Sequence, residues 1–202
     1  VSICSLYERM GQFDKAYDSL PKTLEIKNSS KPLDTQVRFF QRKAWIIVSQ
    51  RKEQKKQEGL DLIFKLKELL FSHNEDNEPL WLWHFYNIKA NYAEWDCDYE
   101  KAVSYYKKCL SIPALGAFEY GATFLNMSIA YRFIYLNKQN KDEDLITKCI
   151  SLGSIGVALK DSVGDRDEMP VVLHNQALNI LNKMQLSKEE LNTIITMTDT
   201  GI

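Results

Sequence analysis

The chain has 202 residues, of which 45% are hydrophobic and 26% are charged, a composition typical of a globular protein that can bury its own core. Its net charge is −1, so it lacks the general positive field that holds nucleic acid through counterion release. No apolar run reaches the roughly 18 residues of a membrane span, and no signal segment opens the chain. We therefore expect neither direct nucleic-acid binding by this chain nor a membrane partner.

The four cysteines are Cys4, Cys97, Cys109 and Cys149, and none of them forms a C-x-x-C motif. Because they fall within apolar helical patterns, we expect buried, reduced thiols in a cytoplasmic protein. The chain opens on "VSICSLYERMG", without Met and already in helical register. We therefore expect a fragment of a longer protein.

Helical periodicity runs through almost the whole sequence, and no stretch alternates as a strand would. Pro21 is expected to interrupt the second helix, and Pro79 is well placed to begin a later one. "SKEE", at 187–190, resembles a capping box that opens the last helix. About ten helices in five antiparallel pairs are predicted, over residues 3–10, 14–27, 34–51, 56–71, 80–95, 99–111, 116–136, 143–162, 168–184 and from 188 onward.

Two segments of the chain repeat one pattern. "GQFDKAYDSLPKTL" aligns with "CDYEKAVSYYKKCL", which places Phe13 on Tyr99, Ala16 on Ala102 and Leu20 on Tyr106. Two helices approach closely only where a small side chain faces the partner, with larger side chains on either side. We therefore interpret Tyr99, Ala102, Tyr106 and Cys109 mainly as packing residues. Further small residues recur at intervals of 38 to 49 residues: Cys4, Ala44, Ala90, Ser128 and Ala177.

This pattern resembles the tetratricopeptide repeat family, although the standard repeat is about 34 residues. The resemblance implies an all-α, right-handed superhelix of about five degenerate helix pairs, with residues 1–202 as one ligand-binding domain. It implies no cofactor, because binding in this family occurs in a groove lined by the first helix of each pair.

The long, irregular repeats also resemble the sensor half of Gram-positive peptide-responsive transcription regulators, the Rgg, PlcR and PrgX group. That resemblance implies a role in quorum sensing, with a short signalling peptide in the concave groove. It also implies an N-terminal helix-turn-helix domain, so that DNA would be bound only through a domain absent from this chain. A homodimer is one way to cover the apolar C-terminal helices.

Groove-side positions follow from the register of the first helices. Asparagine and glutamine can pair with both the N–H and the C=O of a peptide backbone. In peptide-clamping members of the repeat family, asparagines at the positions of Asn91 and Asn126 contact the ligand. The predicted peptide-binding residues are Arg38, Gln41, His84, Asn87, Asn91, Trp95, Asn126, Arg132, Phe133, His174 and Asn175, and Glu94 falls on the same side.

Each of these residues also has an ordinary explanation. Asn and Gln are common on exposed helix faces, and tryptophans mostly pack in cores. The three histidines lack metal-ligand spacing, so no metal site is predicted. No nucleophile–base or phosphate-loop motif occurs, and we expect no enzyme. The alternative to a peptide sensor is a protein–protein scaffold or adaptor without a peptide switch.

Overall fold

The structure is a computed structural model that describes residues 3–21, 32–72, 78–138, 142–165, 175 and 178–180. Every regular element within these ranges is a helix, which confirms the predicted all-α class. The elements are α1 (Ile3–Arg9), α2 (Phe13–Asp18), α3 (Pro32–Gln50), the 3₁₀ turn η1 (Glu53–Lys55), α4 (Lys56–Ser72), α5 (Pro79–Trp95), α6 (Tyr99–Leu110), α7 (Ala117–Asn137) and α8 (Glu143–Ser162).

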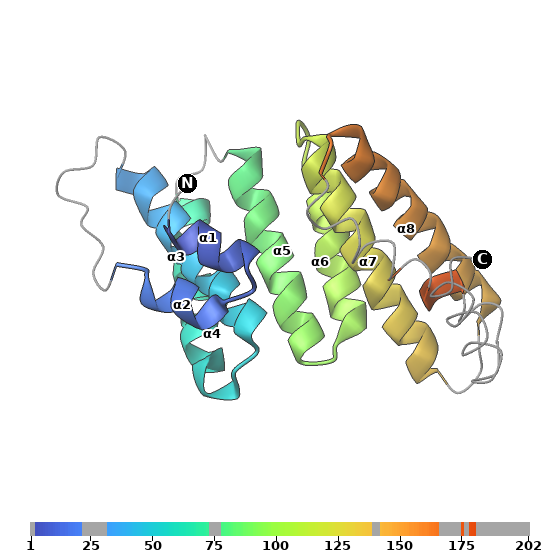
Figure 1. Ribbon diagram of the computed structural model, residues 1–202, viewed down its shortest axis with the longest axis horizontal. Coiled ribbons are helices and arrows are strands. Elements are labelled where there is room, and N and C mark those ends of the chain that lie inside the picture. The colour runs from blue at the N-terminus through green and yellow to red at the C-terminus, as the bar shows by residue number, and fades with distance from the viewer. Residues whose placement is uncertain are drawn as a thin grey trace, which may run out of the picture. The chain divides into compact units, whose positions relative to one another are not determined.

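The chain divides into two compact units, Val1–Leu115 and Gly116–Ile202. The first unit contains α1 to α6, and the second contains α7 and α8 (Figure 1). The single domain expected over residues 1–202 stays a prediction.

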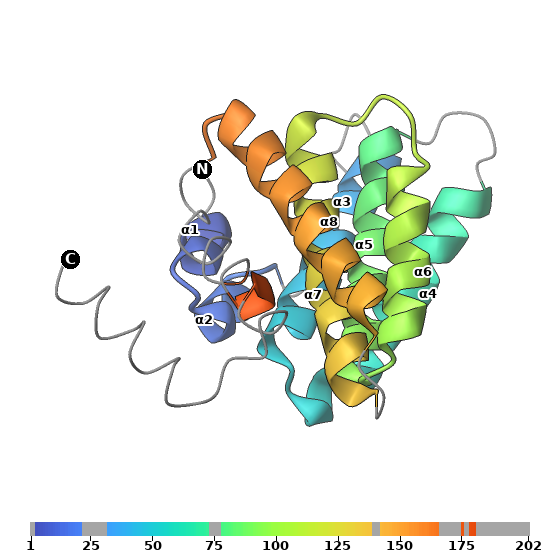
Figure 2. The same ribbon diagram turned by 90° about the vertical axis from the view of Figure 1, so that its right-hand side faces the viewer.

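Neighbouring helices pair in the first unit, α1 with α2, α3 with α4 and α5 with α6 (Figures 1 and 2). The pairs also contact one another, because α2 packs on α3 and both α3 and α4 pack on α5. A helix pair alone leaves one apolar face open, and stacking of the next pair covers it. The pairing agrees with the sequence interpretation, whereas the right-handed superhelix stays a prediction.

Small residues lie where these helices meet. Ala16, Ala44, Ala90 and Ala102 are fully buried and Cys4 is 5% exposed, as the packing argument predicts. Tyr106 and Cys109 are also fully buried, and Tyr99 is half-buried. The largest core joins Val37, Ile47, Leu66, Phe85 and Ile88 from α3, α4 and α5.

The turns between α1 and α2 and between α5 and α6 have the same backbone geometry. Gly11 and Cys97, which the sequence alignment superposes, both have positive φ, +66° and +58°. The next residue donates its amide five residues back in each turn, Gln12 to the Tyr7 carbonyl at 2.8 Å and Asp98 to the Ala93 carbonyl at 2.9 Å. These are the hydrogen bonds of a Schellman helix end.

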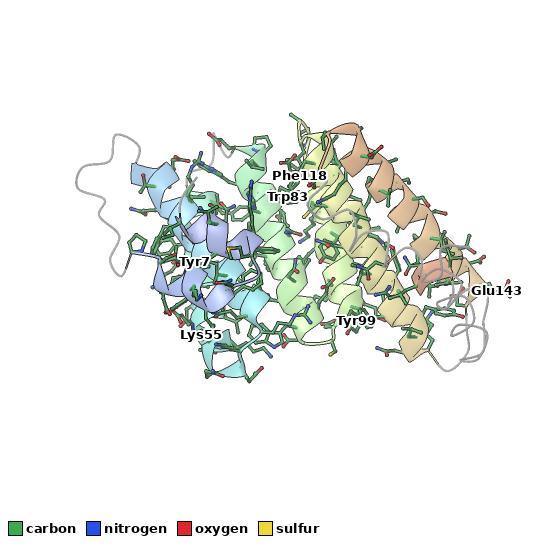
Figure 3. The ribbon with its side chains drawn as sticks, viewed as in Figure 1. Tyr7, Lys55, Trp83, Tyr99, Phe118 and Glu143 are labelled. Carbon is green, nitrogen blue, oxygen red and sulfur yellow. The ribbon has the colours of Figure 1, made fainter. Side chains whose placement is uncertain are left out.

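Two glycines set the closest approach in the second unit. A methyl group at Gly156 of α8 would lie 3.0 Å from the carbonyl oxygen of Gly121 on α7. The two helices therefore approach closely at this crossing, where each has a glycine and no β-carbon lies between them. In Figure 3, Phe118 near the start of α7 and Glu143 at the start of α8 lie at opposite ends of this pair, as antiparallel helices require.

Some expectations need correction, and others lie outside the described residues. The second helix ends at Asp18, and the chain turns at Ser19 and Leu20 just before Pro21, in agreement with the interruption expected at that proline. The rest of that predicted segment, residues 22–27, lies outside the described residues. Cys97 is exposed, not buried, since it occupies the left-handed turn position; the other three cysteines are buried, and all four are free thiols. The last two predicted helices lie outside the described residues, apart from Asn175 and residues 178–180, which are helical.

Candidate functional site

Four predicted binding residues of the first unit lie on two helices that pack against each other, and we call this group the α3–α5 face: Arg38, Gln41, His84 and Asn91. Arg38 and Gln41 lie one turn apart on α3, while His84 and Asn91 lie two turns apart on α5. Helices α3 and α5 pack against each other. The positive charge of Arg38 is near enough to His84 to affect its titration.

His84 is a neutral imidazole at neutral pH. Its pKa is lowered from 6.5 to about 4, mainly by burial and further by the charge of Arg38. The ring lies edge-on to the neighbouring Trp83 ring, with 4.8 Å between centroids. A neutral imidazole offers one donor and one acceptor, so this residue can pair with a polar ligand without adding charge.

Asn91 is half-buried and only partly satisfied within the described part of the chain. Its Nδ2 donates to the Asn87 carbonyl at 2.9 Å, which uses one of its two amide hydrogens. Its Oδ1 and second hydrogen have no hydrogen bond to another described residue. Asn91 therefore keeps one acceptor and one donor. A peptide backbone can pair with both, because its N–H donates to the acceptor and its C=O accepts from the donor.

Arg38 and Gln41 border the face on α3. Arg38 is exposed, with a side chain 67% accessible, and its Nε donates to Asp34 Oδ1 at 2.8 Å within the same helix. Gln41 is half-buried and makes no hydrogen bond to another described residue. Both side chains can therefore reorient toward a ligand at small cost.

Two other predicted residues on α5 are occupied in packing. Asn87 is 5% exposed, and Trp95 packs against the main core, with its ring 5.5 Å from the Tyr92 ring and the Lys56 ammonium 5.2 Å from its centroid. Burial of Asn87 and the packing contacts of Trp95 indicate that both residues have a structural role.

The predicted residues of the second unit lie on α7 and on the helical residues 175 and 178–180. Asn126 and Phe133 are half-buried, two turns apart on α7. Arg132 is only 7% exposed, and its guanidinium hydrogen-bonds Asn175 and Asn179. His174 lies outside the described residues.

The Arg132 contacts belong to a buried polar network that the sequence argument missed. Asn179 Nδ2 donates to Ser128 Oγ at 2.9 Å, and Ser128 Oγ donates to the Cys149 carbonyl, also at 2.9 Å. Ser128 was expected only as a small packing residue, and its hydroxyl has this second role. Asn179 follows Asn175 by one turn, and that i, i+4 spacing was the available signal.

A buried carboxyl group, Glu94, lies near the α5–α6 turn in the first unit. Tyr106 donates its hydroxyl to Glu94 Oε1 at 2.9 Å, and an Arg51 Nη2 lies 3.8 Å from Glu94 Oε2. Burial raises the pKa of Glu94 to about 7, against the lowering effects of the Tyr106 hydrogen bond and the Arg51 charge. Figure 3 shows Tyr99 at the same end of the helix pair. Glu94 was placed on the groove side, but it is a largely buried, hydrogen-bonded group.

The described residues contain no group of three or more His, Cys, Asp or Glu side chains placed to hold a metal ion. Within them, no helix combines the length and the apolar character that crossing a membrane requires.

Comparison of the chain with protein-family models, with curated proteins and with solved structures gave no match in any of the three.

Proposed function

We propose that this protein is a peptide-binding module, which recognises a short extended peptide through polar side chains on the first helices of its pairs. The observation that carries the proposal is the α3–α5 face. There, half-buried polar groups lie on two neighbouring helices, and Asn91 has an acceptor and a donor without partners among the described residues.

An extended peptide needs partners for its backbone N–H and C=O groups, because these groups lose water on binding. Asn91 and Gln41 offer both kinds of group, and the neutral His84 offers the same combination without charge. Asn126, on α7 in the other unit, is the further asparagine that the sequence predicts to contact the peptide. A mixed donor and acceptor surface favours a peptide over a simple ion or an apolar ligand.

The fuller form of the proposal is a cytoplasmic sensor domain of a transcription regulator, in which peptide binding changes the packing of repeats or of a dimer. A ligand shifts such an equilibrium only by its difference in affinity for the two states. The support is the all-helical, paired architecture together with the polar face. DNA binding would belong to a domain outside this chain.

The test is binding of a pooled random hexapeptide library to the full 202-residue chain and to two variants, Asn91→Ala and Asn126→Ala. Each variant is expected to bind the retained peptides roughly 10-fold more weakly, the equivalent of about one hydrogen bond pair. Asn137→Ala is the matched control, because Asn137 is exposed at the end of α7 and outside the proposed contacts.

Circular dichroism of each variant should match the parent chain, which would show that weaker binding is not a loss of folding. Unchanged affinity in both variants would remove the two asparagines from the site. No retained peptide at all in the parent chain would overturn the proposed function.

One observation favours the scaffold alternative. Helix α4 exposes three large apolar side chains, Leu60, Phe64 and Phe71, with 41%, 59% and 43% of their surface accessible. Single exposed hydrophobic residues are common, but a folded partner is one ligand that would cover such a helix face. Loss of partner binding in Phe64→Ser, with peptide binding intact, would favour the scaffold.

A further inference from the structure

One side of the α5–α6 pair gathers lysine and tyrosine side chains from both helices. We call this group the basic α5–α6 surface, and its members are Tyr86 and Lys89 on α5 and Lys101, Tyr105 and Lys108 on α6. Lys101 and Lys108 are exposed, and the other three residues are half-buried. The group lies wholly within the first unit.

Two ammonium groups share the ring of Tyr105. The Lys89 Nζ lies 4.5 Å from the ring centre, and the Lys108 Nζ lies 5.6 Å from it. The two cations are therefore at most about 10 Å apart, roughly one Debye length at 0.1 M salt, so they repel each other. Each also lies over a second ring, Lys89 at 5.4 Å from Phe85 and Lys108 at 5.4 Å from Tyr86. The aromatic rings thus hold two like charges close together on the surface.

No acidic side chain among the described residues forms an ion pair with Lys89 or Lys108. Lys56 shows the other arrangement. Its ammonium lies 5.2 Å from the centre of the Trp95 ring and also pairs with Asp96 at 2.6 Å. The positive charge of Lys89 and Lys108 is therefore uncompensated in the part of the chain that the structure describes.

The acidic residues of the two helices lie away from this surface. The only acid within α5 is Glu94, which is largely buried and hydrogen-bonded. The only acid within α6 is Glu100, five residues before Tyr105 and so about 140° away round the helix. Lys101 adds a third positive charge, and its one ion-pair contact, with Asp98, is long at 4.0 Å. Because the net charge of the chain is −1, the positive field is a local feature of this surface.

The spacing of the charges favours a chain of anionic groups over a single anion. Lys101 and Lys108 are seven residues apart, which places them two turns and roughly 10 Å apart along α6. One carboxylate or phosphate is too small to contact cations at that separation. An extended polypeptide advances about 3.3 Å per residue, so acidic residues three apart in sequence match it. The two tyrosines add apolar contact area and hydroxyl groups, a combination that is enriched at protein interfaces.

We propose that the basic α5–α6 surface binds an acidic segment of a partner protein, in which Asp or Glu recurs about every third residue of an extended chain. The inference goes beyond the proposed function, because it concerns a second surface. Tyr86 and Lys89 lie two residues from His84 and Asn91, and two residues correspond to about 200° round a helix. The basic α5–α6 surface and the α3–α5 face are therefore on different sides of α5.

The test measures binding of a labelled peptide, Glu-Gly-Gly-Glu-Gly-Gly-Glu, to the full chain by fluorescence anisotropy at about 50 mM NaCl. The parent chain should bind this peptide and should not bind its counterpart with Gln in place of Glu. Lys89→Gln and Lys108→Gln should each weaken binding roughly 3-fold, the effect of one exposed ion pair. Lys107→Gln is the matched control, because Lys107 is exposed on α6 but lies on another side of that helix from Tyr105, and it should leave binding unchanged.

Three outcomes would overturn the proposal. The first is no binding of the Glu peptide by the parent chain, or equal binding of the Gln peptide. The second is a loss of affinity in Lys107→Gln as large as in Lys89→Gln and Lys108→Gln, which would show a response to net charge alone. The third is complete displacement of the Glu peptide by inorganic phosphate at matched ionic strength, which would show a site for a single anion.

Asn91→Ala separates this inference from the proposed function. The variant should bind the Glu peptide as tightly as the parent chain does, and a loss would place the acidic peptide on the α3–α5 face and contradict the second surface. Binding of the Glu peptide by a chain that retains no peptide from the random library would support the basic α5–α6 surface and refute the proposed function.

Discussion

Tyr92 and Tyr106 are both buried aromatic residues of the first unit, and their hydroxyl groups have different surroundings. The Tyr106 hydroxyl donates to Glu94 at 2.9 Å. The Tyr92 hydroxyl is buried against Gly59 and has no hydrogen-bond partner among the described residues. Because a buried polar atom without a partner is unfavourable, the two hydroxyls should contribute to stability with opposite signs.

Removal of each hydroxyl tests this difference. Tyr92→Phe should leave the free energy of unfolding unchanged or raise it by up to about 1 kcal/mol, whereas Tyr106→Phe should lower it by about 1 to 2 kcal/mol. Urea denaturation at pH 8, where Glu94 is mostly ionised, is the measurement. The same chemical change is made at both sites, so each variant is the control for the other. A larger loss from Tyr92→Phe than from Tyr106→Phe would contradict the account.

Glu94 and His84 should give opposite pH dependences of stability. The pKa of Glu94 is raised to about 7, so folding favours its protonated form, and stability falls as pH rises from about 4.5 to 7. The pKa of His84 is lowered to about 4, so folding favours its neutral form, and stability falls as pH drops from about 6.5 to 4. Each shift corresponds to about 3 kcal/mol, and the two effects largely cancel between pH 4.5 and 6.5.

Single variants should reveal each dependence. In Glu94→Gln only the His84 effect remains of these two, so the free energy of unfolding should fall as pH is lowered from 6.5 to 4.5. In His84→Gln the Glu94 effect remains, and the free energy of unfolding should fall as pH is raised through the same interval. Urea denaturation at half-unit pH steps measures both slopes. Slopes identical to that of the parent chain in both variants would refute these pKa shifts.

At the scale of elements, the turns at Gly11 and Cys97 are equivalent positions with different residues. A residue with a β-carbon is strained at positive φ, and glycine is not. Cys97→Gly should therefore raise the free energy of unfolding by about 0.5 to 1 kcal/mol, and Gly11→Ala should lower it by about 1 kcal/mol. Thermal and urea denaturation would check both changes. A loss of stability in Cys97→Gly would show that the thiol has a stabilising contact that outweighs the strain.

The helices themselves were largely predictable from sequence, and the reasons are local. Apolar residues recur at helical spacing, Pro79 begins α5, and Asp98 caps α6 by accepting from the Lys101 amide at 3.1 Å. The buried alanines were predictable because small residues repeat in equivalent places. The exposed Cys97 was not, since a thiol in an apolar sequence pattern gives no sign that its backbone adopts the left-handed turn conformation.

The candidate site was predictable only in part. Register placed Arg38 with Gln41 on one side of α3, and His84 with Asn91 on one side of α5, because residues three, four and seven apart share a side of a helix. The burial of Arg132 depends on contacts between elements distant in the sequence. Arg132 is 43 residues from Asn175, and Asn179 is 51 residues from Ser128. No local pattern specifies such pairs.

At the scale of the whole molecule, the two compact units differ in the interactions that stabilise them. The first, Val1–Leu115, has three stacked helix pairs, with a main apolar core between α3, α4 and α5 and a smaller one around Ala16 and Ile46. In the second, α7 and α8 cross at Gly121 and Gly156, and a buried polar network surrounds Ser128 and Arg132. The polar network requires a specific partner for each of its members, whereas the apolar core of the first unit requires only complementary packing.

The central claim is that the protein binds a short peptide, and native purification tests it most directly. The full chain would be isolated gently from its source cells, and the bound material would be analysed by mass spectrometry after denaturation. The account predicts a short peptide of defined sequence, present with the parent chain and reduced with Asn91→Ala. A folded protein partner in place of a peptide, or a peptide equally abundant with Asn91→Ala, would contradict it.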